Sequence, residues 1–157
     1  MTHWLVYWKT YWDDVDDPST LDPEWNSSYD QLYEHATLGD TIWVVVASRQ
    51  SNESTWRLLE RFNFASKEVT PDSPLGFRYR FNGDHSTHIL YDPTQPADIT
   101  GVLTTLRFET DNPIRLTGRR IAQALQSPRK LNHLDARKLE IHAQGLTQIP
   151  RRHHGAA

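Results

Sequence analysis

Runs of apolar residues predict the strands in the first half of the chain. Residues 3–8 (HWLVYW) are aromatic or branched at nearly every position, which predicts a strand. The run 41–47 (TIWVVVA) is apolar on both faces, as is typical of a buried central strand, and Leu38-Gly39-Asp40 predicts a tight turn before it. Residues 55–64 could form a helix or a strand, and we favour a strand because aromatic residues continue to the end of this segment.

In the second half, polar and apolar positions alternate more clearly. Residues 77–81 (FRYRF) predict a strand with one face in water. Asn82-Gly83-Asp84 is a hairpin signal, so we expect the chain to return as a strand over 86–91. A loop over 92–96 then leads to residues 101–108 (GVLTTLRF), which predict another strand.

The N-terminal strand is followed by polar residues. Four aspartates within residues 13–17, followed by Pro18, predict an exposed acidic loop. Their spacing is not that of an EF-hand, which needs a central glycine and a terminal glutamate. Asn26-Ser27-Ser28-Tyr29 can then cap a short helix that runs to about His35.

Two further helices are expected near the C-terminal end. Thr117 can cap a helix over 119–126, whose apolar residues fall on one face, and Pro128 follows its end. Residues 135–144 predict the last helix, which Gly145 stops.

The order of these elements predicts an α+β fold. Short turns join most neighbouring strands, so we expect a strongly curved, largely antiparallel β-sheet that closes into a barrel flanked by short helices. Nothing in the pattern suggests a repeat or a second domain. We therefore expect a single domain over residues 1–148 and a flexible basic tail over 149–157.

Composition narrows the function classes. The chain of 157 residues has no cysteine, which excludes disulfides, thiolate zinc sites and a cysteine nucleophile. No apolar run approaches the ~20 residues that a membrane helix needs. The N-terminal residues do not resemble a signal peptide. We therefore expect a cytoplasmic protein that does not bind a membrane.

The net charge of −3 hides an uneven distribution. Residues 1–40 contain nine acids and one base, whereas residues 115–157 contain nine bases and two acids. The basic end can attract phosphates. It can equally pack against the acidic start of the same domain, and the sequence leaves both interpretations open.

No catalytic or metal-binding motif is found. The sequence contains no G-x-S-x-G, no P-loop and no H-E-x-x-H. His85 and His88 are three residues apart on an expected strand, so they point to opposite faces. We therefore predict no catalytic residue, no metal ligand and no cofactor.

The six tryptophans are the most unusual feature, and all lie between Trp4 and Trp56. Trp4 and Trp43 fall in apolar strands and are expected in the core. Trp25 lies in a polar segment, where an indole can equally fill the core or form the wall of a pocket. Trp12 and Trp56 lie beside loops, and either of them could form a second wall of the pocket.

Two segments resemble a known family. The first is Trp4-Leu5-Val6-Tyr7-Trp8-Lys9-Thr10, an aromatic strand that ends in Lys-Thr. The second is Trp25-Asn26-Ser27-Ser28, followed by a short helical stretch and then Leu38-Gly39-Asp40 leading into the 41–47 run. Together they are similar to the PUA-like superfamily and, within it, to the EVE and YTH domains. The resemblance covers roughly residues 3–47.

This resemblance implies a β-barrel that binds a modified base in an aromatic pocket. Related domains read methylated adenine in RNA or modified cytosine in DNA, and such modules often accompany restriction enzymes. The partners implied are therefore nucleic acid with a modified base and a nuclease or other defence-system protein. Trp25 would form a cage wall, Asn26 and Ser27 would contact the base edge, and Lys9 and Thr10 would lie at the pocket mouth.

Other interpretations remain open. Arg49 and Arg57 are candidate phosphate contacts, although arginines near turns are usually just solvated. In a neighbouring PUA-like group, the ASCH type, small nucleoside amidohydrolases occur, and there Lys9 would be a catalytic base with a nearby threonine and glutamate. A third interpretation is a protein-interaction module that uses the acidic and basic ends as complementary surfaces.

Overall fold

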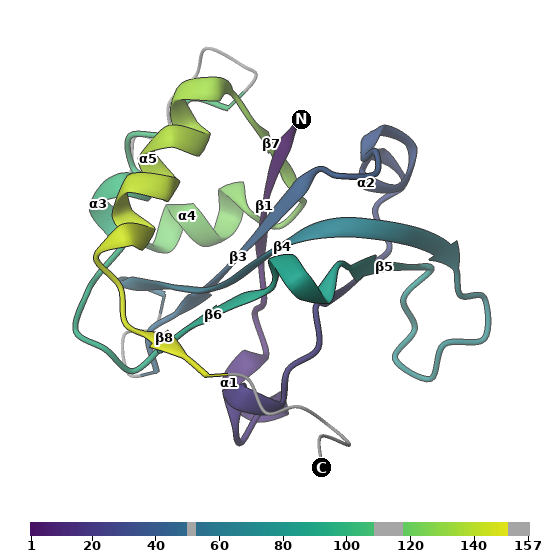
Figure 1. The fold of residues 1–157 in the computed structure, drawn as a ribbon, viewed down its shortest axis with the longest axis horizontal. Coiled ribbons are helices and arrows are strands. Elements are labelled where there is room, and N and C mark those ends of the chain that lie inside the picture. The colour runs from purple at the N-terminus through teal and green to yellow at the C-terminus, as the bar shows by residue number, and fades with distance from the viewer. Residues whose placement is uncertain (50–52, 109–117, 151–157) are drawn as a thin grey trace.

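The computed structural model describes residues 1–49, 53–108 and 118–150 (Figure 1). The fold is mixed α+β, as expected, and is built on one large sheet. Its strands are β1 (His3–Tyr7), β2 (Glu24–Ser27), β3 (Thr41–Ala47), β4 (Trp56–Val69), β5 (Tyr79–Gly83), β6 (Ile89–Tyr91), β7 (Arg129–Leu131) and β8 (Gln148–Ile149).

The helices are short and lie around the sheet. They are α1 (Tyr11–Asp14), α2 (Asp30–His35), α3 (Thr100–Leu103), α4 (Gly118–Ala124) and α5 (His133–Gln144), with two 3₁₀ turns, η1 (Pro18–Thr20) and η2 (His85–Thr87). In Figure 1, α3, α4 and α5 gather on one side, whereas α2 lies toward the other end of the sheet, near β5.

The sheet is open rather than closed. The strands pair in the order β2-β5-β4-β3-β1-β7, and β6 pairs with β4 and β8. Every pairing is antiparallel except that of β1 with β3, which is parallel. No pairing between described residues joins β2 to β7, so the expected barrel is not confirmed.

Strand β4 controls the curvature of the sheet. Its first part pairs with β3 and its second part pairs with β5, with register shifts between Val44 and Val45 and between Phe64 and Ser66. Such irregularities bend a strand and increase its twist. The bend carries β5 and its neighbour β2 away from the plane of the central strands.

Side chains of β1 and β3 alternate between two cores, one on each face of the sheet. Leu5, Trp43 and Val45 belong to the core that is covered by α3, α4 and α5. Trp4 and Val44 belong to the other core, against which Trp25 packs. The prediction of a central strand that is buried on both faces is therefore confirmed for β3, where only Ala47 is partly exposed.

The buried carboxylate of Asp40 fixes the start of both central strands. It is 2% exposed and accepts hydrogen bonds from the Thr2 amide (3.0 Å), the Trp4 indole (3.2 Å) and the Thr37 amide (2.9 Å). Gly39, with φ of +91°, makes the expected turn before it. The prediction that Trp4 lies in the core is therefore confirmed. The predicted Gly-Asp turn is confirmed as well.

The predicted hairpin at 82–84 is wrong. β5 pairs with β4 and β2, and β6 pairs with β4 and β8, so the two strands are not neighbours. The Asp84 side chain accepts a hydrogen bond from the Ser86 amide and starts the turn η2 instead. A Cβ at Gly83 would lie 2.4 Å from the Phe62 ring, so this glycine permits close packing rather than a reversal.

The predicted strand over 101–108 is also wrong, because the chain forms helix α3 and turns there. Its buried residues Ile99, Leu103 and Leu106 are spaced by four and three positions, which is the helical period rather than the strand period.

Two expectations near the N-terminus also need correction. Residues 24–27 form the strand β2, so Asn26 and Ser27 do not cap α2, which begins at Asp30. The acidic segment 13–18 is not a simple loop, because its first two aspartates end helix α1.

The last two helices are confirmed. α4 begins one residue before the expected range and ends two residues before its end, and its expected cap, Thr117, lies outside the described residues. α5 begins two residues earlier than expected, at a capping box formed by Asn132 and Asp135. Ile149, expected in the tail, belongs to β8, and residues 151–157 lie outside the described part of the chain.

Candidate ligand-binding cleft

A cleft of about 740 Å³ opens where the end of β1, strand β2 and the connection from α4 to β7 meet. β2 and β1 are separated by three strands in the sheet order, yet both line this cleft. The curvature of the sheet therefore brings its edge strand back toward its centre. The cleft has aromatic walls, made by Trp8, Trp25, Tyr29 and Phe77.

Five of the predicted site residues meet in this cleft: Lys9, Thr10, Trp25, Asn26 and Ser27. The first two follow β1, and the other three form most of β2. The segment between them, which contains α1 and η1, returns the chain from the centre of the sheet to its edge.

Trp25 is half-buried, and its indole packs against the core on this side of the sheet. Its Nε1 is inaccessible to water and has no hydrogen-bond acceptor among the described residues. A buried donor without an acceptor costs free energy, typically about 1–3 kcal/mol. A small displacement that brings an acceptor to this N–H is therefore favourable.

The mouth of the cleft is held by Asp14 at the end of α1. Its Oδ2 accepts hydrogen bonds from the Trp8 indole (3.0 Å) and from the Thr10 hydroxyl (2.6 Å). These bonds fix the orientation of Trp8, whose ring edge also packs on the buried Tyr11. Lys9, between the two donors, is exposed and lines the cleft.

Strand β2 supplies the polar groups of the cleft. The Asn26 amide nitrogen donates to Glu24 (3.2 Å), which leaves the Asn26 carbonyl oxygen as an acceptor. The Ser27 hydroxyl oxygen accepts a bond from the Tyr29 amide (3.1 Å), which leaves its own proton as a donor. Glu24 is paired with Arg80 of β5 (3.1 Å). Asn26 and Ser27 both line the cleft, and as neighbours on a strand their side chains point to opposite faces of the sheet.

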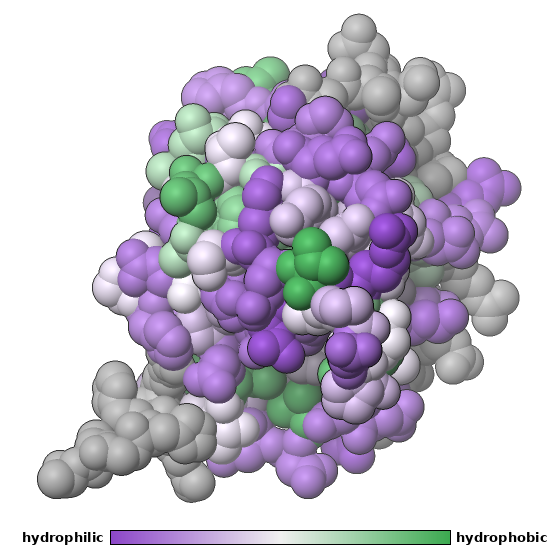
Figure 2. All heavy atoms as spheres, turned by 90° about the vertical axis from the view of Figure 1, so that its right-hand side faces the viewer, coloured by the Kyte–Doolittle hydropathy of each residue, from purple (hydrophilic) through white to green (hydrophobic). Residues whose placement is uncertain are grey.

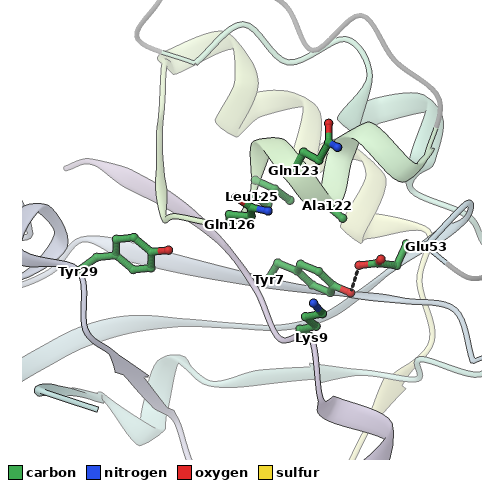
Figure 3. A pocket seen from close by; sticks show the side chains of 8 residues that line it. All are labelled: Tyr7, Lys9, Tyr29, Glu53, Ala122, Gln123, Leu125 and Gln126. Atoms are coloured by element: carbon green, nitrogen blue, oxygen red, sulfur yellow. Dashed lines mark hydrogen bonds between the residues drawn. The ribbon is translucent and has the colours of Figure 1, made fainter. Parts of the chain in front are cut away.

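A second compartment of about 730 Å³ adjoins the first (Figure 3). Tyr7 and Lys9 form one side, and the other is covered by the C-terminal end of α4 and the two residues after it, Leu125 and Gln126. The Tyr7 hydroxyl donates to Glu53 across the far end (2.7 Å). Burial, together with this hydrogen bond, raises the pKa of Tyr7 well above its usual range, so the phenol stays protonated and keeps donating.

Trp56, one of the two candidate second walls, lies in the core. It is 0% exposed, and its ring packs edge-on against Tyr7 at 4.6 Å between centroids. Trp12 is half-buried on α1, and its indole donates to the Ala47 carbonyl (2.7 Å). Neither residue lines the Trp25 compartment, where Trp8 takes the position expected of them.

The two candidate phosphate contacts also lie elsewhere. Arg57 donates to the carbonyls of Gln95 (2.9 Å) and Trp56 (3.0 Å) and is paired with Asp98 (3.7 Å), so its charge fixes a loop. Arg49 is exposed, and its guanidinium lies over the Trp12 ring at 5.8 Å.

The sequence interpretation did not assign Trp8, Tyr29 or Phe77 to the pocket. Tyr29 and Phe77 are 45% and 39% exposed, and they come from the ends of β2 and the loop before β5. An aromatic side chain beside a turn is only a weak indication, in a sequence, that the residue lines a pocket. Trp8 gave a stronger one, because it directly precedes the Lys-Thr pair.

The surface near α2 and the β4–β5 loop is mainly hydrophilic, with small, separate apolar groups (Figure 2). A broad apolar docking surface is therefore not found on this face. No group of three or more His, Asp or Glu able to hold a metal ion occurs among the described residues. Within the same residues, no helix is long and apolar enough to cross a membrane.

Comparison with known proteins adds no family to this description. No protein-family model matches the chain, and no curated protein matches it either.

Proposed function

We propose that the cleft binds one unstacked, modified nucleobase of a DNA or RNA strand. One observation carries the proposal: Lys9, Thr10, Trp25, Asn26 and Ser27, the residues that the EVE resemblance implies, line a single aromatic-walled cleft. They come from two segments of the chain, and curvature of the sheet brings those segments together. A chance resemblance in sequence would not require the two segments to meet in one cleft.

The energetics suit an aromatic cleft. A base that leaves its stack loses a few kcal/mol. Stacking against aromatic side chains returns ~1–3 kcal/mol per base, and a fully buried methyl group adds ~0.8 kcal/mol. Trp8 and Trp25 supply the aromatic surface, and the methyl group of a modified base would be buried against them.

The polar groups of β2 suit the edge of a base. An amino group of adenine or cytosine would donate to the Asn26 carbonyl oxygen. The Asn26 acceptor is complementary to the amino group that both bases present on this edge.

We further infer that the chain is a divergent PUA-like domain of the EVE type whose sheet remains open. On this view, a modification-dependent nuclease is the class of partner that such a module would direct to its target.

The experiment is a titration of tryptophan fluorescence at low salt with short RNA and DNA strands. One strand of each set contains N6-methyladenine, one contains 5-methylcytosine and one is unmodified. We expect one modified strand to quench the fluorescence at the lowest concentration. Trp25→Ala should weaken its binding about tenfold or more.

Trp12→Ala is the matched control, because both tryptophans are half-buried and pack on the same core. It should bind like the unchanged protein. If no strand binds, or if both variants lose binding equally while remaining folded, the proposal is wrong.

A second candidate is a nucleoside amidohydrolase, because Lys9, Thr10 and Glu24 line the same cleft. In this alternative, Lys9 takes a proton from water, which attacks the acyl carbon of an N4-acylated cytidine, and cytidine leaves with the proton. Lys9 is exposed, whereas lysines that act in catalysis are usually desolvated, so we rank it second. Release of acetate from N4-acetylcytidine that is lost in Lys9→Ala would favour it over base binding.

A further inference from the structure

We propose that the cleft recognises two adjacent nucleotides, with the phosphodiester between them bound at Lys9. The modified base would occupy the Trp25 compartment, and the neighbouring base would occupy the compartment between Tyr7 and α4. This inference rests on the proposed function, and it names the ligand as a segment of single strand rather than a lone nucleoside.

The two compartments are joined and similar in size. Their volumes are about 740 and 730 Å³. Five residues line both, namely Tyr7, Lys9, Tyr29, Leu125 and Gln126. A ligand that fills one compartment therefore contacts residues that also line the other.

The charges place the phosphate at this border. Lys9 is the one cationic side chain among the described residues that line either compartment, and it lines both. Asp14 and Glu24 line the Trp25 compartment alone, and Glu53 lines the other alone. A phosphate placed deep in either compartment would meet a carboxylate, whereas at the border it meets the ammonium group.

The second compartment has a wall suited to a base. The Tyr7 ring is held from behind by the edge of Trp56 at 4.6 Å, and its hydroxyl is held by Glu53 at 2.7 Å. A ring fixed at both ends offers a stacking surface at little entropic cost. Gln126 and Tyr29 line this space together with Tyr7 (Figure 3). They can therefore contact the edge of a base.

Glu53 lies in the turn between β3 and β4. Glu53 has a left-handed backbone, with φ of +66°, which is unfavourable for a residue with a side chain. Strain of this kind is found at binding sites, where the surrounding structure maintains it. Here it places a carboxylate where it fixes the wall of the second compartment.

The experiment compares N6-methyladenosine and 5-methylcytidine as free nucleosides with their dinucleoside monophosphates, which carry each of the four bases as the neighbour on either side. We expect the better-bound modified nucleoside to gain about fivefold or more in affinity when a neighbour is added on one particular side. Replacing the phosphodiester with an uncharged methylphosphonate should cost about two- to fivefold of that gain.

Lys9→Ala should weaken binding by the same factor. In that variant the methylphosphonate should have no further effect, because both changes remove the same interaction. Lys130→Ala is the matched control, since this exposed lysine on β7 lines neither compartment. In that variant the methylphosphonate should weaken binding as it does in the unchanged protein.

The outcomes separate the two proposals. If a free nucleoside binds as tightly as every dinucleotide, one base is still recognised and the two-nucleotide inference is wrong. If the effects of Lys9→Ala and the methylphosphonate multiply, the phosphate does not lie at Lys9. If neither nucleosides nor dinucleotides bind, both the inference and the proposed function are overturned.

Discussion

Strands β3 and β2 each have a tryptophan near the middle, and they use it in opposite ways. β3 is paired on both sides, and Trp43 is 0% exposed with its indole donating to His3 Nδ1 at 2.9 Å. β2 is an edge strand, and Trp25 is half-buried with an N–H that lacks an acceptor. The same side chain thus contributes to stability where its contacts are complete, and it is available for binding where they are incomplete.

The strongest test of this contrast is Trp43→Ala. Removing a fully buried tryptophan leaves a cavity, and such changes cost about 3–5 kcal/mol of unfolding free energy. We expect the variant to be unfolded or close to unfolding at room temperature. Urea denaturation followed by circular dichroism measures the loss.

Trp25→Ala should have a smaller effect on stability, below about 2 kcal/mol. Part of this side chain already faces the cleft, and no hydrogen bond is lost with it. The same denaturation experiment measures it. An equal loss in the two variants would contradict the contrast between the strands and would make Trp25 a core residue.

The smallest expected effect concerns pH at the β3 tryptophan. Burial lowers the pKa of His3 below its usual value, a shift that Glu140 opposes and Arg61 supports. The folded protein therefore resists protonation of this ring, whereas the unfolded chain takes up the proton below about pH 6.5. The stability that neutral His3 maintains is thus present above that pH and is lost as pH falls through the lower pKa of the folded state.

His3→Gln removes this titration. Its stability should fall less than that of the unchanged protein between pH 7.5 and pH 5, as measured by thermal unfolding. The other histidines are common to both proteins and cancel in the comparison. Parallel stability curves for the two proteins would mean that His3 is not coupled to folding.

Much of the central sheet was predictable from local pattern. The 41–47 run is apolar on both faces because β3 has a core on each side. Trp4 and Val6 alternate with Leu5 because β1 lies beside it. Patterns of this kind depend only on which faces are buried, and a sequence records that directly.

The sequence did not reveal where the edge strands pair. β2 has polar residues because it lines a cleft, so it lacks the alternation that identifies a strand. Asn82-Gly83-Asp84 has the composition of a hairpin, but its glycine is needed against Phe62 and its aspartate caps a 3₁₀ turn. Tertiary contacts that involve distant parts of the chain decided both cases.

The same limit applies to the site. Lys9, Thr10, Trp25, Asn26 and Ser27, which line the cleft, lie in two short segments, and the sequence singled them out through the EVE resemblance. Gln126 and Glu53 could not be identified in this way, because they reach the cleft from the residues after helix α4 and from the turn before β4. Nothing local marks either residue as part of a site.

The division of the cleft between distant segments also has an evolutionary consequence. The aromatic wall that would read a modification comes from β1 and β2, whereas the cover of the second compartment comes from α4. If the cleft binds two nucleotides as proposed, substitutions in α4 would change which neighbouring base is preferred while the Trp25 wall is inherited unchanged. A lineage of such proteins could diversify its target sequences and keep one chemical mark in common.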